Sequence, residues 1–292
     1  MKIKKLVIPA AGRGTRFLPF TKAVPKELVP VLDKPILQII IEEAAQSGIE
    51  EVIIVISPEK NVIREYFTPD NKLVEFLQAQ GKKDQAKAVS QIEKLPKISY
   101  TYQRKPLGNG HAVLCARKFI DPEEFFAVVW ADEYYHCEIP RLKQIIQATQ
   151  KHEKATLTLM ESPEDKFEKW CSKYGNVGGK EIEKSIIQIE EMIEKPTPDK
   201  ALSKYFALGG YVLPGKIMNI LKETQPGKSG EIWLADGLEK LALSGELIGK
   251  IIEGEYYDFG NKVGFVAGNV AVGLSDPSVE PELRETLKEL MK

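Results

Sequence analysis

The fold is decided by residues 5–35, which read KLVIPAAGRGTRFLPFTKAVPKELVPVLDKP. The apolar run Lys5–Ile8 predicts a short buried β-strand, and the turn Gly12-Arg13-Gly14 follows it closely. In open α/β sheets, ligands bind beyond the carboxyl ends of the strands. We therefore expect the residues after Ile8 to line a binding site.

This turn carries groups that can hold an anion. Gly12 and Gly14 let the backbone approach a phosphate or a base without a Cβ, and their N–H groups can face the anion. Arg16 adds a bidentate phosphate donor, and Lys26 adds a point charge. The turn is not a dinucleotide-binding fingerprint, because Phe17 stands where GxGxxG needs its third glycine. The Gly-Lys-Ser/Thr of a Walker A loop is also absent.

Strand-like and helix-like runs alternate through the first half of the chain. Apolar runs without polar alternation are typical of strands covered on both faces of a sheet. The expected order is strand Lys5–Ile8, helix Pro35–Ser47, strand Val52–Ile56, helix from Ser57 to about Phe67, a helical excursion over Asn71–Leu95, strand Ile98–Gln103, helix from about His111, strand Phe125–Trp130 and helix Ile139–Lys151. This order predicts an open parallel sheet with right-handed crossovers.

The second half has a mixed pattern. We expect strands at Ala155–Met160, Ser185–Glu191, Phe206–Leu213 and Leu247–Ile252, and helices at Glu231–Leu243, Lys262–Gly273 and Pro281–Met291. No Ser/Gly/Pro linker separates the halves, so one domain over residues 1–292 is expected. The predicted fold class is α/β, Rossmann-like, with a mostly parallel (mixed) central sheet, helices on both faces and a smaller second lobe.

Composition and charge exclude several functions. The chain has 292 residues, of which 43% are hydrophobic and 28% charged, and its net charge is −1. No overall positive field attracts nucleic acid or an anionic membrane. The three cysteines lie far apart without a CxxC spacing, so neither disulfides nor a zinc site is indicated. No run approaches the roughly 18 apolar residues of a membrane span. We expect a cytoplasmic protein.

A second motif, QRKPLGNGHAV at residues 103–113, follows a predicted strand. The Gln103 amide can satisfy both a donor and an acceptor edge of a pyrimidine. Gly108 lets the backbone do the same. His111 also lies in the motif, and we favour a structural role for it, as an N-terminal helix residue that hydrogen-bonds its own loop.

Acidic residues follow the strand predicted at residues 125–130. Asp132 and Glu133 stand at its carboxyl end, where a carboxylate is well placed to share Mg²⁺ with a substrate phosphate. Asp258, in YDFGNK, reads equally as a ligand or as an N-cap or loop residue. Glu194-Lys195-Pro196 follows an apolar strand, and such a pair could hold a hydroxyl and a phosphate.

The pattern GxGTRxLPxTKxxPKExxPxxxKP over residues 12–35 resembles the signature of bacterial UTP–glucose-1-phosphate uridylyltransferases, which are sugar nucleotidyltransferases. The resemblance runs over essentially the whole chain. It implies Mg²⁺-dependent transfer of UMP from UTP to glucose 1-phosphate, giving UDP-glucose and pyrophosphate, by a homodimer or homotetramer. It also implies a nucleotide-binding lobe over about residues 1–135 and a sugar-phosphate lobe over 136–292.

The resemblance assigns roles residue by residue. Arg16 and Lys26 neutralise the triphosphate and are catalytic, and Asp132 and Asp258 hold the metal. Glu27 contacts the uracil, where thymidylyltransferase relatives carry Gln. The other nucleotide-binding residues are Ala10, Ala11, Gly12, Gly14, Gln103 and Gly108, and the sugar-phosphate contacts are Gly175, Glu194 and Lys195.

Departures from the family pattern keep alternatives open. Many relatives have a second Asp at Glu133. Trp233 stands where Gln is usual and Ala235 where Thr is usual. Either the region near the sugar has lost two polar groups, or Trp233 packs at a subunit contact. A dTTP-dependent enzyme, another sugar 1-phosphate, and a sugar-nucleotide-binding regulator without turnover are the alternatives. The intact set Arg16, Lys26, Asp132 and Lys195 argues against the regulator.

Overall fold

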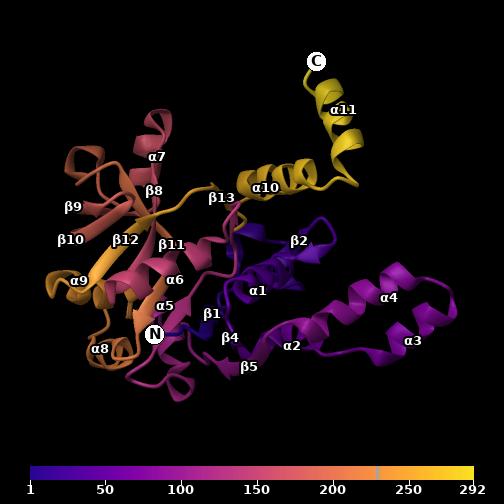
Figure 1. Ribbon diagram of the computed structural model, residues 1–292, viewed down its shortest axis with the longest axis horizontal. Helices are drawn as coiled ribbons and strands as arrows, with labels where there is room; N and C mark the ends of the chain where they lie inside the picture. Colours follow the sequence, from indigo (N-terminus) through magenta and orange to yellow (C-terminus); the bar gives the residue numbers. More distant parts are fainter. Residues whose placement is uncertain (228–229) are drawn as a thin grey trace.

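The computed structural model describes residues 1–227 and 230–292. In these ranges one central sheet has the strand order β5-β4-β1-β6-β11-β8-β12-β10-β9 (Figure 1). The strand bounds are β1 Lys5–Pro9, β4 Glu51–Ile56, β5 Lys97–Tyr102, β6 Phe125–Val128, β8 Ala155–Glu161, β9 Gly175–Glu183, β10 Ile186–Glu194, β11 Tyr205–Pro214 and β12 Leu247–Ile251.

The sheet is parallel in its first half and mixed in its second. Strands β5, β4, β1 and β6 all run in one direction. Strand β11 pairs antiparallel with both β6 and β8, and β12 returns parallel to β8. This arrangement confirms the predicted mixed α/β sheet, and the β6–β11 pairing makes the sheet continuous between the two halves of the chain.

Helices cover both faces of the sheet. Their bounds are α1 Ile36–Gln46, α2 Val62–Tyr66, α3 Asn71–Ala79, α4 Lys83–Ser90, α5 Asn109–Leu114, α6 Arg141–His152, α7 Phe167–Cys171, α8 Ile217–Glu223, α9 Leu234–Leu243, α10 Lys262–Ser275 and α11 Glu280–Leu290. Successive residues of β1 point to opposite faces. Leu6 and Ile8 therefore pack in the cluster with α1 and α6, and Val7 packs in the cluster with α5, α8 and α9.

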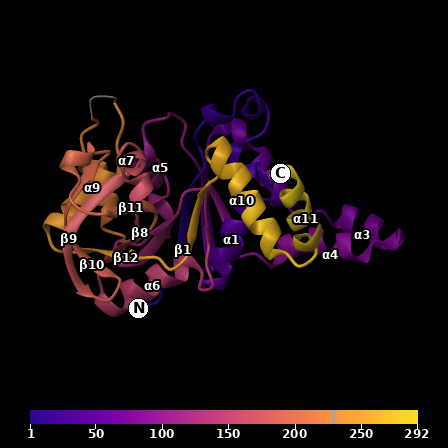
Figure 2. The ribbon, with the colours of Figure 1, turned by 90° about the horizontal axis from the view of Figure 1, so that it is seen from above.

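The outlying helices mark two ends of the molecule. The pair α3 and α4 projects from the body beyond β5 and α2 (Figure 1). Helix α10 lies on the α1 side of the molecule and leads to α11 at the C-terminus (Figure 2). Within residues 1–227 and 230–292, no helix is both long and apolar enough to cross a membrane.

Several elements differ from the sequence prediction. A two-stranded sheet, which the sequence analysis did not predict, joins β7, Glu133–His136, to β13, Glu255–Asp258. Strand β9 and helices α7 and α8 were also not predicted from the sequence. The helix expected from Ser57 begins as a 3₁₀ turn over Pro58–Lys60, and the Ser57 side chain does not cap it. Helix α9 begins at Leu234, three residues later than expected.

Candidate active site

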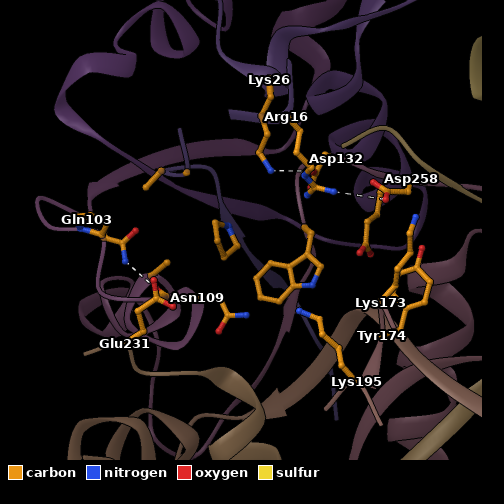
Figure 3. A pocket seen from close by; sticks show the side chains of 18 of the residues that line it. Arg16, Lys26, Gln103, Asn109, Asp132, Lys173, Tyr174, Lys195, Glu231 and Asp258 are labelled. Atoms are coloured by element: carbon orange, nitrogen blue, oxygen red, sulfur yellow. Dashed lines mark hydrogen bonds and ion pairs between the residues drawn. The ribbon is translucent and has the colours of Figure 1, made fainter. Parts of the chain in front are cut away.

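A cleft of about 700 Å³ opens at the carboxyl ends of β1, β5 and β6, as the sequence predicts for a ligand site in an α/β sheet. Segments from both halves of the chain form its wall (Figure 3). The lining residues are Pro9, Ala11, Gly12, Arg16, Lys26, Gln103, Pro106, Gly108, Asn109, Ala112, Trp130, Asp132, Glu133, Ser172, Lys173, Tyr174, Lys195, Glu231, Tyr256 and Asp258.

The loop after β1 presents only part of its predicted set to the cleft. Ala11 and Gly12 line it. Ala10 is buried, and its N–H donates to the Val55 carbonyl at 2.8 Å, which continues the β1–β4 pairing by one residue. Gly14 is left-handed, with φ 65°, and a Cβ there would lie 3.2 Å from Lys26 Cβ. Ala10 and Gly14 therefore shape the loop from outside the cleft wall.

Glu27 requires a correction. We expected it to contact a base, but its side chain is fully buried and does not line the cleft. Its two oxygens accept hydrogen bonds from Lys60 Nζ at 2.9 and 2.8 Å. Burial raises the pKa of Glu27 and lowers the pKa of Lys60, and their mutual attraction opposes both shifts. Glu27 lies behind the loop because its carboxylate has this cation as its partner.

The two predicted catalytic cations face the two predicted metal ligands (Figure 3). Lys26 Nζ lies 2.7 Å from Asp132 Oδ2, and Arg16 Nη1 lies 3.9 Å from Asp258 Oδ2. Burial acts to lower the pKa of Lys26, but the attraction of Asp132 and Glu27 outweighs it, so the pKa is raised. Lys26 is therefore a firmly charged group at the cleft.

The β7–β13 pairing explains how Asp132 and Asp258, which are 126 positions apart in the sequence, come together. Asp258 lies opposite Glu133 in the register, and the Phe259 N–H donates to the Asp132 carbonyl at 2.9 Å. Gly260 lies between the carboxylates, since a Cβ there would be 2.5 Å from Asp132 Oδ2 and 2.9 Å from Asp258 Oδ1. Mg²⁺ is usually bound by one or two carboxylates together with phosphates and water. This donor set fits that ion.

On a second side of the cleft, Gln103 and Gly108 are connected by a hydrogen bond. Gln103 Nε2 donates to the Gly108 carbonyl at 2.9 Å and lies 3.0 Å from His111 Nδ1. Gly108 has φ 97°, and a Cβ there would lie 2.5 Å from the Ile232 carbonyl oxygen. His111 does not line the cleft, and burial lowers its pKa. It supports the Gln103 amide as a neutral side chain.

Lys195 approaches the cleft from the opposite side to Arg16 and Lys26 (Figure 3). Its backbone is left-handed, with φ 49°, an uncommon conformation that changes the direction of the chain after β10. Gly175 and Glu194 were predicted as sugar contacts, but neither lines the cleft. They are register partners in β9 and β10, and a Cβ on Gly175 would lie 3.2 Å from Glu194 Oε2. Gly175 thus makes room for the Glu194 carboxylate.

Sequence reasoning missed part of the lining, namely Asn109, Trp130, Ser172, Lys173, Glu231 and Tyr256. Trp130 packs edge-on against Tyr211 and occupies the space that a Cβ on Gly209 would need, 1.9 Å from its Cδ1. Its place at the end of the predicted buried strand was the one available signal. Trp233 is 39% exposed and does not line the cleft, whereas Glu231, two residues earlier, does.

Glu133 lines the cleft and is the neighbour of Asp132 in the chain. Its Oε2 is enclosed and has no hydrogen-bond partner among the described residues. Burial, followed by the neighbouring Asp132 charge, raises the pKa of Glu133 to about 8. The carboxyl is therefore mainly protonated at neutral pH.

Known proteins share the sequence pattern of this chain. Residues 5–273 match the family model described as nucleotidyl transferase. The chain belongs to the nucleotidyl transferase family. This nucleotidyl transferase is 37% identical, over all of its length and 96% of the relative's, to a UTP–glucose-1-phosphate uridylyltransferase of Bacillus subtilis. It is 39% identical to a protein of the same name from Staphylococcus saprophyticus, over 99% of this chain and 98% of the relative.

Solved structures resemble the nucleotidyl transferase over nearly the whole chain. A structure described as UTP-bound UGPase from Acinetobacter baumannii has a TM-score of 0.89 at 32% identity, covering 99% of this chain and all of that one. A UDP-glucose pyrophosphorylase complexed with UDP-glucose has a TM-score of 0.84 at 34% identity, covering 94% and 100%. The family resemblance inferred from residues 12–35 is confirmed.

Proposed function

We propose that this nucleotidyl transferase transfers UMP from UTP to glucose 1-phosphate, giving UDP-glucose and pyrophosphate. The observation that carries the proposal is one cleft in which Arg16 and Lys26 stand on one side and Lys195 on another, around the carboxylates of Asp132 and Asp258. Full-length similarity to uridylyltransferases supports the choice of UTP and glucose 1-phosphate.

Both substrates are anions, so charge is the first obstacle to the reaction. A phosphate oxygen of glucose 1-phosphate attacks the α-phosphorus of UTP in line. A P–O bond forms, the bond from that phosphorus to the bridging oxygen breaks, and its electron pair leaves with pyrophosphate. No general base is needed, because the attacking phosphate is already ionised. Catalysis rests on positioning and electrostatic stabilisation, as in other phosphoryl-type transfers.

The cations have separate tasks in this scheme. Lys195, on the side opposite Arg16 and Lys26, holds the phosphate of the sugar. Arg16 and Lys26 bind the triphosphate and offset the charge that grows on the leaving pyrophosphate. Lys26 starts from its 2.7 Å contact with Asp132 and so stands next to the carboxylate that is expected to hold the ion.

The base is read by Gln103 and Gly108, with Ala11 and Gly12 against it. Because Gln103 Nε2 is engaged by the Gly108 carbonyl, its Oε1 is the atom left to accept from the uracil N3–H. Glu27 takes no direct part, since it is buried against Lys60. The preference for UTP therefore depends on the Gln103 side of the cleft.

Asp132 and Asp258 would hold Mg²⁺, with Gly260 leaving the space between them. When bound, the ion neutralises phosphate charge and orients the α-phosphate.

Residues 1–135 supply the nucleotide side of the cleft, and residues 136–292 supply Lys173, Lys195 and Asp258. Helix α10 exposes Val263 and Val266 at 77% and 58%, which supports assembly of copies into a dimer or tetramer.

The test is pyrophosphate release from purified protein, measured with UTP, dTTP and other nucleotides against a panel of sugar 1-phosphates. The highest kcat/KM is expected for UTP with glucose 1-phosphate. A preference for dTTP or for another sugar phosphate would replace the substrate assignment. Binding of UDP-glucose without pyrophosphate release from any pair would favour the regulator and refute the enzyme.

A further inference from the structure

Lys60 belongs to none of the motifs, yet it contacts two of the segments that form the cleft. It ends the 3₁₀ turn Pro58–Lys60 that follows β4. Its Nζ lies 2.8 Å from the Ala10 carbonyl oxygen and 2.5 Å from that of Gly12. The same Nζ lies 2.9 and 2.8 Å from the two oxygens of Glu27.

These contacts use the whole capacity of the ammonium group. A lysine has three N–H donors and no acceptor, and four protein oxygens already share them. Lys60 is 8% exposed and does not line the cleft. It is therefore not available to bind a ligand, and any effect on the reaction must pass through the groups it holds.

The first of these groups is the loop after β1. In a trans peptide unit, the carbonyl and the N–H point in opposite directions. Because the Ala10 carbonyl is directed at Lys60, the N–H of Ala11, in the same peptide unit, points away from Lys60. Ala11 and Gly12 line the cleft, whereas Lys60 does not. The lysine thus fixes how this backbone is presented to a ligand.

The second group is the turn that carries Lys26. Glu27 directly follows Lys26 in the 3₁₀ turn Lys26–Leu28, and its fully buried carboxylate is tied to Lys60. The ammonium therefore links the nucleotide loop to the turn whose Lys26 reaches Asp132. Removing the link frees two walls of the cleft to move relative to each other.

We propose that Lys60 is a positioning residue for nucleotide binding. It holds the backbone at Ala11 and Gly12 and the Lys26 turn in the arrangement that receives the base and phosphates, without touching the substrate. The inference rests on the proposed function, since it takes the nucleotide to bind on this side of the cleft. The competing explanation is that the Lys60–Glu27 pair only stabilises the fold.

The test uses Lys60→Met and the double variant Lys60→Met/Glu27→Met. Methionine keeps an unbranched side chain, one atom shorter than that of lysine, and removes the N–H donors. Lys60→Met alone leaves the Glu27 carboxylate buried and unpaired, which is strongly destabilising. The double variant removes both charges and is expected to recover the melting temperature. It supplies the measurement if the single variant fails to fold.

Lys5→Met is the matched control. Lys5 Nζ also joins a carboxylate to a carbonyl, at 2.7 Å from Glu124 Oε1 and 2.8 Å from the Phe119 oxygen. It stands at the amino end of β1, and the cleft stands at the carboxyl end. Its loss is expected to lower the melting temperature and to leave every KM unchanged.

Two readouts separate positioning from stability, namely titration calorimetry of UTP without sugar phosphate, and KM for each substrate. We expect the double variant to bind UTP about tenfold or more weakly, with a KM for glucose 1-phosphate that changes much less. Wild-type UTP affinity in the folded double variant would overturn the proposal. Failure of the proposed function would appear separately, in the wild type, as a preference for another nucleotide, and the titration is then made with that nucleotide.

Discussion

Gly260→Ala tests whether Asp132 and Asp258 act together at the reacting centre. The backbone at Gly260 is not left-handed, so alanine introduces no strain in the main chain. Its Cβ would lie 2.5 Å from Asp132 Oδ2, 2.9 Å from Asp258 Oδ1 and 3.2 Å from Arg16 Nη2, whereas ordinary contacts begin at 3.4 Å. The three atoms nearest to the new methyl therefore all belong to groups of the cleft.

The size of the effect follows from these distances. Asp132 Oδ2 must move by about 0.9 Å to restore an ordinary contact. Asp258 cannot yield freely, because its Oδ1 accepts from the Gly260 N–H at 2.8 Å. A misplacement of about 1 Å costs up to roughly 100-fold in rate. We expect kcat to fall by about 10- to 100-fold, and the Mg²⁺ concentration for half-maximal activity to rise.

The assay is pyrophosphate release at saturating UTP and glucose 1-phosphate, titrated with Mg²⁺. The control is Gly273→Ala in α10, where the new methyl crowds only the tip of the Leu283 side chain, at 2.6 Å, and makes ordinary contacts with Val279 and Leu32. It is expected to keep wild-type kcat and Mg²⁺ dependence. A Gly260→Ala enzyme with both parameters unchanged would refute the reasoning, because the two carboxylates would then not share an ion across this glycine.

Three further predictions concern single side chains. Asp132→Asn should fold normally, as judged by its melting curve, but lose turnover by orders of magnitude, because the proposed Mg²⁺ would lose a ligand. Lys195→Ala should raise KM for glucose 1-phosphate about tenfold or more and spare UTP binding, whereas Lys26→Ala should mainly depress kcat. Equal weakening of UTP binding by both variants would contradict the assignment of Lys195 to the sugar phosphate. Glu133 has a pKa of about 8 in the folded state and 4.5 ordinarily. Between these two pH values unfolding releases its proton, so the free energy of unfolding falls as the pH rises from about 4.5 to 8. Glu133→Gln should make the melting temperature decline less over that range, and an identical decline would contradict the raised pKa.

The sequence was sufficient where the relevant groups are neighbours in the chain. The strand Lys5–Pro9, its glycine turn and the cations Arg16 and Lys26 lie within about twenty residues, so one local pattern predicts both the strand and the anion-binding groups. Asp132 was found in the same way, because it follows a buried apolar strand. Both segments do reach the cleft, since parallel neighbouring strands end at the same edge of a sheet.

The tertiary structure decided the roles that depend on partners distant in the chain. The residue type at position 27 suits a base contact, but Lys60 turns it into a buried ion pair. Glu194 was expected to follow an apolar strand, but it is the last residue of β10, and the β9–β10 register places it opposite Gly175, whereas Lys195 lines the cleft. In each case the local pattern specifies a chemical group, and a partner remote in sequence determines where that group points.

One physical cause separates the features that the sequence determined from those that the tertiary structure decided. Periodicity, glycine turns and charged residues within a few positions express short-range backbone preferences, and these determined the α/β class, most of the strands and the nucleotide loop from the sequence alone. The pairing of β7 with β13, the meeting of Asp132 with Asp258 around Gly260, and the Lys60–Glu27 link join residues 33 to 126 positions apart. Such contacts form only when the whole sheet assembles, so the tertiary structure alone decided them.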